Sequence, residues 1–211
     1  MNLQFSTREL RDLLLAWLAL GVAFTVFLER DLVRALQQAP GTIDPGVAVT
    51  LLLMSLGTAG MGFLLHELAH KVVAIRFGQD AAFRADYGML LLAILGGLIG
   101  FLFAAPGAVV HRGRISARER GLIALAGPLT NLVLAGLFLG ALLALDPAGQ
   151  SLLAAVGSRG FLINLLLAGF NMIPFGPLDG ATVLAWNKIV FAITFLVTAG
   201  PALAIVLGVF P

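Results

Sequence analysis

The chain has 211 residues, of which 60% are hydrophobic and only 11% are charged, and its mean hydropathy is +1.02. These values exclude an ordinary soluble globular protein and indicate a polytopic membrane protein. A net charge of only +2 gives no sign of a nucleic-acid-binding surface. Because cysteine is absent, disulfides and thiolate metal ligands are excluded too, and any metal must be held by nitrogen and oxygen.

Five stretches are apolar enough for membrane helices, each of which needs about 20 residues. In chain order they cover roughly 10–28, 47–76, 121–145, 152–173 and 187–210. The first follows Arg8 and Arg11, but no small-residue cleavage site comes after it, so we expect a retained span and not a signal peptide. No long polar segment follows. We therefore predict an all-α helix bundle with about five to six transmembrane helices, forming a single membrane-embedded domain over 1–211.

The stretch over about 88–110 is apolar, but its glycines and Ala105-Pro106-Gly107 weaken it as a helix. Cytoplasmic loops are enriched in Lys and Arg, which offers a test of its course. If 88–110 crosses the membrane, six basic residues face seven, with no bias between the two sides. If it enters and returns on the same side, ten face three. We therefore expect a re-entrant, partly non-helical segment, with the basic side of the protein in the cytoplasm.

The pentad His66-Glu67-Leu68-Ala69-His70 has the pattern HExxH and ends the long apolar run that begins at Val47. Two histidines four residues apart lie on one helical face, where both can bind a single metal ion. The glutamate between them is placed to act as general base toward a metal-bound water. His66 lies ten residues before Arg76, so we expect the pentad roughly 15 Å below the cytoplasmic surface.

The acidic residues other than Glu67 and Asp179 fall at the ends of predicted spans or in loops. An ionisable side chain at membrane depth costs roughly 2.5–3.5 kcal/mol, so these two carboxylates need a function. Asp179 follows a segment with two prolines and a glycine, Pro174-Phe175-Gly176-Pro177-Leu178, where the chain can turn back toward the pentad. We predict that His66, His70 and Asp179 bind one Zn²⁺ per chain, with Glu67 as the catalytic residue.

Three motifs in this order resemble the site-2 protease family of intramembrane zinc metalloproteases. They are HExxH, Gly127-Pro128-Leu129-Thr130-Asn131, and the Asn171…Pro174…Asp179-Gly180 pattern, and they cover residues about 50–185. The resemblance implies that a catalytic core over about 47–185 cleaves peptide bonds within or near transmembrane segments. It implies the same ligands and catalytic Glu67, and places Asn171 and Asn131 near the substrate or the oxyanion. A structural role for either asparagine, bonding a neighbouring helix, stays open.

The resemblance further implies single-span membrane proteins as substrates, cut either for signalling or to clear membrane remnants. We expect a multi-pass protein of the cell membrane, surrounded by the lipid bilayer, with its active site toward the cytoplasmic side and no nucleic-acid partner. A regulatory membrane partner or an oligomer stays open. Two alternatives also stay open: a metal or proton transporter that uses the intramembrane His, Asp and Glu side chains, and a membrane binding protein without proteolytic activity.

Overall fold

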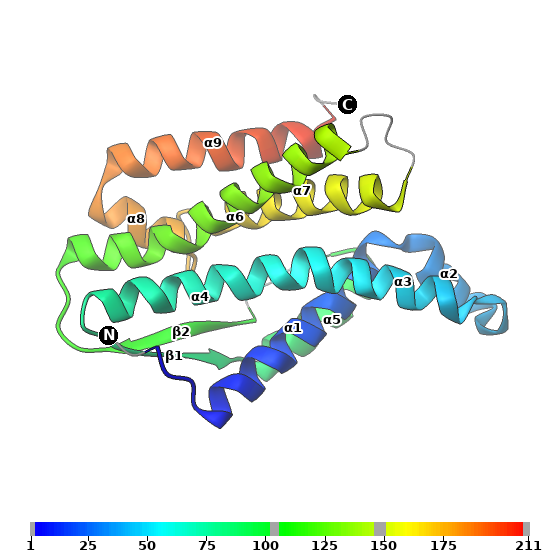
Figure 1. Cartoon of the computed structure of the whole chain (residues 1–211), viewed down its shortest axis with the longest axis horizontal. Helices are drawn as coiled ribbons and strands as arrows, with labels where there is room; N and C mark the ends of the chain where they lie inside the picture. The colour runs from blue at the N-terminus through cyan, green and yellow to red at the C-terminus, as the bar shows by residue number, and fades with distance from the viewer. Residues whose placement is uncertain (1–2, 102–105, 146–150, 209–211) are drawn as a thin grey trace. The chain divides into compact units, whose positions relative to one another are not determined.

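The structure is a computed structural model, which describes residues 3–101, 106–145 and 151–208. It is an all-α polytopic fold with one small two-stranded sheet, as the composition indicates (Figure 1). Five helical stretches are long and apolar enough to cross a membrane, and they match the five predicted spans: Thr7–Leu28, Pro45–Arg76, Ala117–Leu145, Leu152–Asn171 and Lys188–Ile205. The protein is therefore a membrane protein.

The elements follow one another along the chain with short connections. In order they are α1 (Thr7–Leu28), α2 (Arg30–Gln38), the 3-10 turn η1 (Pro40–Thr42), α3 (Pro45–Ser55), the π-helical turn η2 (Leu56–Gly60), α4 (Met61–Arg76), β1 (Asp80–Ala85), α5 (Tyr87–Ile99), β2 (Gly107–Arg112), α6 (Ala117–Leu145), α7 (Leu152–Asn171), α8 (Asp179–Trp186) and α9 (Lys188–Val206).

The segment expected to re-enter the membrane is partly helical and partly strand. Its helix, α5, has 13 residues, so it is about 20 Å long and shorter than the hydrocarbon core. The backbone N–H of Asp86 donates to the carbonyl of Pro106 over 2.9 Å, which brings the chain back beside the residue where it left β1. At the other end of the sheet, the Gln79 side chain donates to the Arg114 carbonyl. The two strands therefore run antiparallel, and a returning course is what these contacts support.

The chain divides into two compact units. Unit 1 comprises Met1–Leu3, Leu65–Ala81 and His111–Pro211, and unit 2 comprises Gln4–Leu64 and Ala82–Val110. Unit 1 holds the HExxH pentad and Asp179. Unit 2 holds α1, α5 and the π-helical turn. The prediction of a single domain over 1–211 stays a prediction.

Unit 2 buries two acidic residues at the end of a predicted span. Glu9 and Asp12 lie near the start of α1, but both are buried, with only 1% and 2% of their surface exposed. Glu9 Oε1 accepts a hydrogen bond from the backbone N–H of Phe83 at 2.9 Å, and Asp12 Oδ1 accepts one from the Tyr87 hydroxyl at 2.6 Å. The residues that bond these carboxylates lie more than seventy positions away in the sequence, so their burial could not be read from the sequence around them.

The π-helical turn η2 interrupts the long helical stretch before the pentad. A π-turn displaces the regular backbone hydrogen bonds, and one of its carbonyls, that of Leu56, accepts a bond from the Trp17 indole at 3.1 Å. A Cβ at Gly60 would lie 2.6 Å from the same indole, so glycine is needed for this close approach. Elsewhere in unit 2, Arg30 donates to the last carbonyls of α5, Gly97 at 2.9 Å and Leu98 at 3.1 Å, where a cation is favourable.

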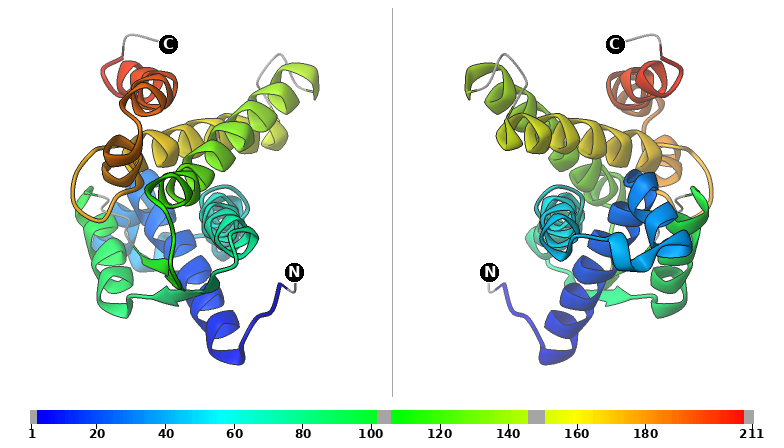
Figure 2. Two further views of the ribbon diagram at one scale, coloured as in Figure 1. Left: turned by 90° about the vertical axis from the view of Figure 1, so that its left-hand side faces the viewer. Right: turned by 90° about the vertical axis from the view of Figure 1, so that its right-hand side faces the viewer.

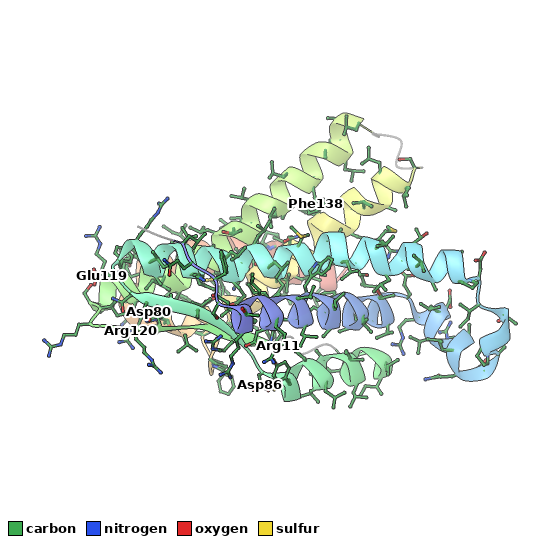
Figure 3. All side chains as sticks on the ribbon, turned by 60° about the horizontal axis from the view of Figure 1, so that its bottom comes forward. Arg11, Asp80, Asp86, Glu119, Arg120 and Phe138 are labelled. Carbon is green, nitrogen blue, oxygen red and sulfur yellow. The ribbon has the colours of Figure 1, made fainter. Side chains whose placement is uncertain are left out.

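Unit 1 is built from α6, α7, α8 and α9, with α6 lying along both α7 and α8 (Figures 1 and 2). Small residues allow these helices to approach closely, as is usual in membranes. A Cβ at Gly160 of α7 would collide with the ring of Phe138 on α6, which is labelled in Figure 3. The start of α6 is fixed by a capping box, in which Ser116 and Glu119 each bond the other's backbone N–H.

Candidate metal centre

Helix α4 presents the two histidines of the pentad on one face. The His66 and His70 rings lie edge to face with their centroids 4.6 Å apart, as the four-residue spacing requires. The possible ligand atoms of His66, Glu67 and His70 all lie within 4.8 Å of one another, and all three side chains are buried. Three buried groups this close, two of them basic and one acidic, form a compact set of metal donors.

Asp179 joins this set from the first turn of α8. Its Oδ2 lies 3.3 Å from Nε2 of His66 and 3.3 Å from Nε2 of His70. Bonds of about 2.0–2.2 Å to a tetrahedral zinc place neighbouring ligand atoms about 3.3–3.6 Å apart, so the spacing fits such an ion. Oδ2 is buried and accepts no hydrogen bond from the residues that the structure describes. A buried carboxylate oxygen in that position fits a metal ligand, and the donor set suits zinc.

The neighbour of Asp179 fixes where that carboxylate lies. A Cβ at Gly180 would collide with the backbone carbonyl of Met172, a residue with no exposed surface. The first turn of α8 can therefore pack on the end of α7 only because residue 180 is glycine. Gly176 has a φ of +59°, which lets the segment between the two helices reverse direction. The sequence Asp179-Gly180 thus combines a ligand with the contact that places it.

Each imidazole is held through its other nitrogen. His70 Nδ1 lies 2.7 Å from the carbonyl of Ile123 on α6. A carbonyl can only accept, so Nδ1 carries a proton, and in the neutral ring Nε2 then has its lone pair toward Asp179. His66 Nδ1 lies 2.6 Å from Oδ1 of Asn131, also on α6. Both rings therefore direct Nε2 toward Asp179, which is the orientation that metal-binding histidines adopt.

Gly127 leaves open the space beside the two ring nitrogens. A Cβ at this position would collide with Nε2 of His66 and lie 2.5 Å from Nε2 of His70. Gly127 is buried on α6, next to Pro128, which lacks an N–H and disturbs the turn before it. That turn supplies the Ile123 carbonyl bound by His70. The Gly127-Pro128 pair therefore lies against the metal centre itself.

The two asparagines predicted near the substrate lie in different places. Asn131 is fully buried and contacts His66, as described above. Asn171 lies at the end of α7, partly buried, and its Nδ2 donates to the carbonyl of Leu167 one turn earlier at 2.9 Å. Their predicted roles toward substrate or oxyanion stay predictions.

His111, the third histidine, lies in β2. It is partly exposed, and partial burial together with the charge of Arg120 lowers its pKa below the usual 6.5. A lowered pKa keeps the imidazole neutral at pH 7. It is not one of the residues that the structure brings to within 4.8 Å of the pentad's donor atoms.

Sequence reasoning missed one polar residue of this centre. Asn164, in the middle of α7, is fully buried and accepts a hydrogen bond from Asn131 at 2.9 Å. A polar side chain within an apolar span is itself a signal, and it could have marked Asn164 for attention.

Comparison with known proteins gives a relative that matches along almost its entire length. The protein named "Putative zinc metalloprotease MJ0611", from Methanocaldococcus jannaschii, is 40% identical over 199 residues, covering 93% of this chain and 94% of the relative. "Putative zinc metalloprotease YwhC" of Bacillus subtilis is 32% identical, covering 69% of this chain and 70% of the relative. "Putative zinc metalloprotease Rip2" of Mycolicibacterium smegmatis is 32% identical over 67% of this chain and 60% of its own.

No family model matches the chain. No solved structure matches it either.

Proposed function

This chain belongs to the zinc metalloprotease family of these relatives, and we propose that it hydrolyses peptide bonds within or next to transmembrane segments of membrane proteins. The observation that carries the proposal is the approach of Asp179 Oδ2 to within 3.3 Å of both imidazole Nε2 atoms, inside a protein with five membrane-capable helices. A buried donor set of this kind has few uses other than holding a metal ion.

In this proposal, His66, His70 and Asp179 hold the zinc, as in the site-2 protease family that the motifs resemble. A zinc ion held by these residues would supply a Lewis acid that polarises a substrate carbonyl and makes a bound water more acidic. Glu67, the next residue after the first ligand, accepts the proton of the attacking water and returns it to the leaving amine. His66, Glu67 and His70 are buried, and a low local dielectric strengthens charge interactions.

The proposed substrates are single-span membrane proteins, because His66 and His70 lie on a helical stretch that is long enough to cross the bilayer. A substrate helix has its carbonyls in internal hydrogen bonds, so it must unwind locally before a water can attack. We place the protein in the cell membrane as a multi-pass protein with the metal centre nearer the cytoplasmic side, on the distribution of its basic residues.

The test uses the full chain in detergent or liposomes with a single-span reporter. Glu67→Gln removes the general base and keeps the shape of the side chain. We expect its hydrolysis rate to fall by about 10²–10⁴-fold while one zinc per chain is retained. Asp31→Asn is the matched control, since its carboxylate is 96% exposed and lies in unit 2, and it should cleave like the wild type.

Two outcomes would contradict the proposal. Cleavage by Glu67→Gln at the wild-type rate would exclude the assigned base. A wild-type protein that binds zinc but moves it across a liposome membrane, without cutting any single-span reporter, would indicate transport and not proteolysis.

A further inference from the structure

Asn131 and Asn164 are buried amides that the proposed reaction does not use. Neither has any exposed surface, and they lie on neighbouring helices, α6 and α7. A buried amide is costly unless its oxygen and nitrogen both find partners. Their hydrogen bonds form a chain that begins at the main chain of α7 and ends on a proposed zinc ligand.

The direction of this chain is fixed at its far end. Asn164 Nδ2 lies 2.9 Å from the carbonyl oxygen of Gly160, which can only accept, so the amide nitrogen of Asn164 must face it. The oxygen of Asn164 then faces Asn131, where it accepts from Nδ2 at 2.9 Å. This leaves Asn131 Oδ1 toward His66 Nδ1, 2.6 Å away. Because an amide oxygen carries no hydrogen, Nδ1 of His66 must carry the proton.

His66 and His70 thus both carry a proton on Nδ1, but different acceptors hold it there. His70 bonds a backbone carbonyl directly, and no rearrangement of side chains can turn that acceptor into a donor. His66 bonds a side-chain amide, which could present its NH₂ group after a rotation of about 180°. The bond from Asn131 Nδ2 to Asn164 Oδ1 opposes that rotation.

We propose that Asn164 is a positioning residue which, through Asn131, holds His66 with its proton on Nδ1 and its Nε2 lone pair toward the metal. The inference rests on the proposed zinc centre and adds to it a residue 33 positions from Asn131 along the sequence. Outer partners that orient metal-binding histidines affect metal affinity by about 10- to 100-fold when they are removed. Asn164 should therefore matter for zinc binding although it does not touch the metal donors.

The first test compares Asn164→Leu with Thr198→Val in the full chain in detergent. Both changes remove a buried side-chain bond to the carbonyl four residues earlier in the same helix, that of Gly160 or Thr194. Of these two residues, only Asn164 is linked to His66, through Asn131. Zinc affinity is measured by competition with a chelator, and the visible absorption of the Co²⁺-loaded protein reports ligand geometry. We expect Asn164→Leu to weaken zinc binding by about 10- to 100-fold and Thr198→Val to leave it unchanged.

The second test asks whether the effect passes through Asn131. In Asn131→Asp, both side-chain oxygens are acceptors, so either one can bond His66 Nδ1–H whatever residue 164 is. Asn131→Asp added to Asn164→Leu should therefore restore zinc affinity and the Co²⁺ spectrum. Equal zinc affinity of Asn164→Leu and Thr198→Val would overturn the proposal, as would a loss that Asn131→Asp leaves unchanged.

Reporter cleavage is measured separately on the same samples. Normal cleavage and zinc binding by Asn164→Leu would refute the positioning role and leave the proteolytic function intact. Weak zinc binding by Asn164→Leu, with a wild type that binds zinc and cuts no reporter, would support the positioning role and refute the function.

Discussion

The two units differ in how their buried polar side chains are paired. In unit 2, Asp12 accepts from the Tyr87 hydroxyl at 2.6 Å and lies 3.5 Å from the Arg11 guanidinium, so the acid faces donors of its own unit. In unit 1, three acceptor atoms of the neutral imidazoles and the carboxylate face one another. They are Nε2 of His66, Nε2 of His70 and Oδ2 of Asp179.

The difference teaches how to tell a structural polar cluster from a functional one. A structural cluster pairs each acceptor with a donor, as unit 2 does around Asp12. Neutral ring nitrogens and a carboxylate oxygen that face one another need a positive ion between them or a proton on one of the rings. The expected effects therefore separate by cluster: changes around His66, His70 and Asp179 should alter zinc binding, and changes around Asp12 should alter stability.

The largest effect is expected at Gly127. Gly127→Ala puts a methyl group against the ring nitrogens of His66 and His70, so we expect zinc affinity to fall roughly 100-fold, corresponding to about 3 kcal/mol of overpacking. Gly136→Ala is the matched control, because it lies on the same helix and its Cβ would meet nothing within 4 Å. Chelator competition on both purified variants decides the point, and wild-type affinity in Gly127→Ala would remove Gly127 from the metal centre.

A smaller effect, on stability and not on zinc binding, is expected at Asp12. Asp12→Ala leaves the Tyr87 hydroxyl without this acceptor, which should lower the free energy of unfolding by about 1–3 kcal/mol. Zinc affinity should not change. Thermal unfolding in detergent measures the change in stability, and it is run on wild type, Asp12→Ala and the exposed control Asp31→Ala. Competition with a chelator measures zinc affinity in the same three proteins. A large loss of zinc affinity in Asp12→Ala would show that the cluster around Asp12 and the metal centre are not independent.

The smallest effect is expected at Tyr87. Tyr87→Phe retains the ring and removes the hydroxyl, which donates to Asp12 and accepts from the exposed Arg11 side chain, so we expect a loss of about 1 kcal/mol or slightly more, less than for Asp12→Ala. The same thermal measurements test it. If Tyr87→Phe and Asp12→Ala destabilise equally, the Tyr87 hydroxyl accounts for all the stability that Asp12 contributes.

The sequence by itself determined the features that depend on neighbouring residues. Runs of apolar residues predicted the five membrane-capable helices, because spanning depends on composition over about 20 positions. The adjacency of His66 and His70 follows from the pitch of one helix. The glycines and Pro106 correctly indicated a partly non-helical segment over 88–110, although its division into α5 and β2 was not foreseen.

Tertiary structure alone decided the features that join distant positions. Motif order suggested that Asp179 reaches the pentad, but only the packing of α8 sets its 3.3 Å distances. The burial of Glu9 and Asp12 and the link from Asn164 to His66 depend on which helices meet, and a helix's own sequence does not specify its neighbour. The physical reason is that hydrogen bonds and burial are set by contacts in space, whereas periodicity records only what a single helix does along its length.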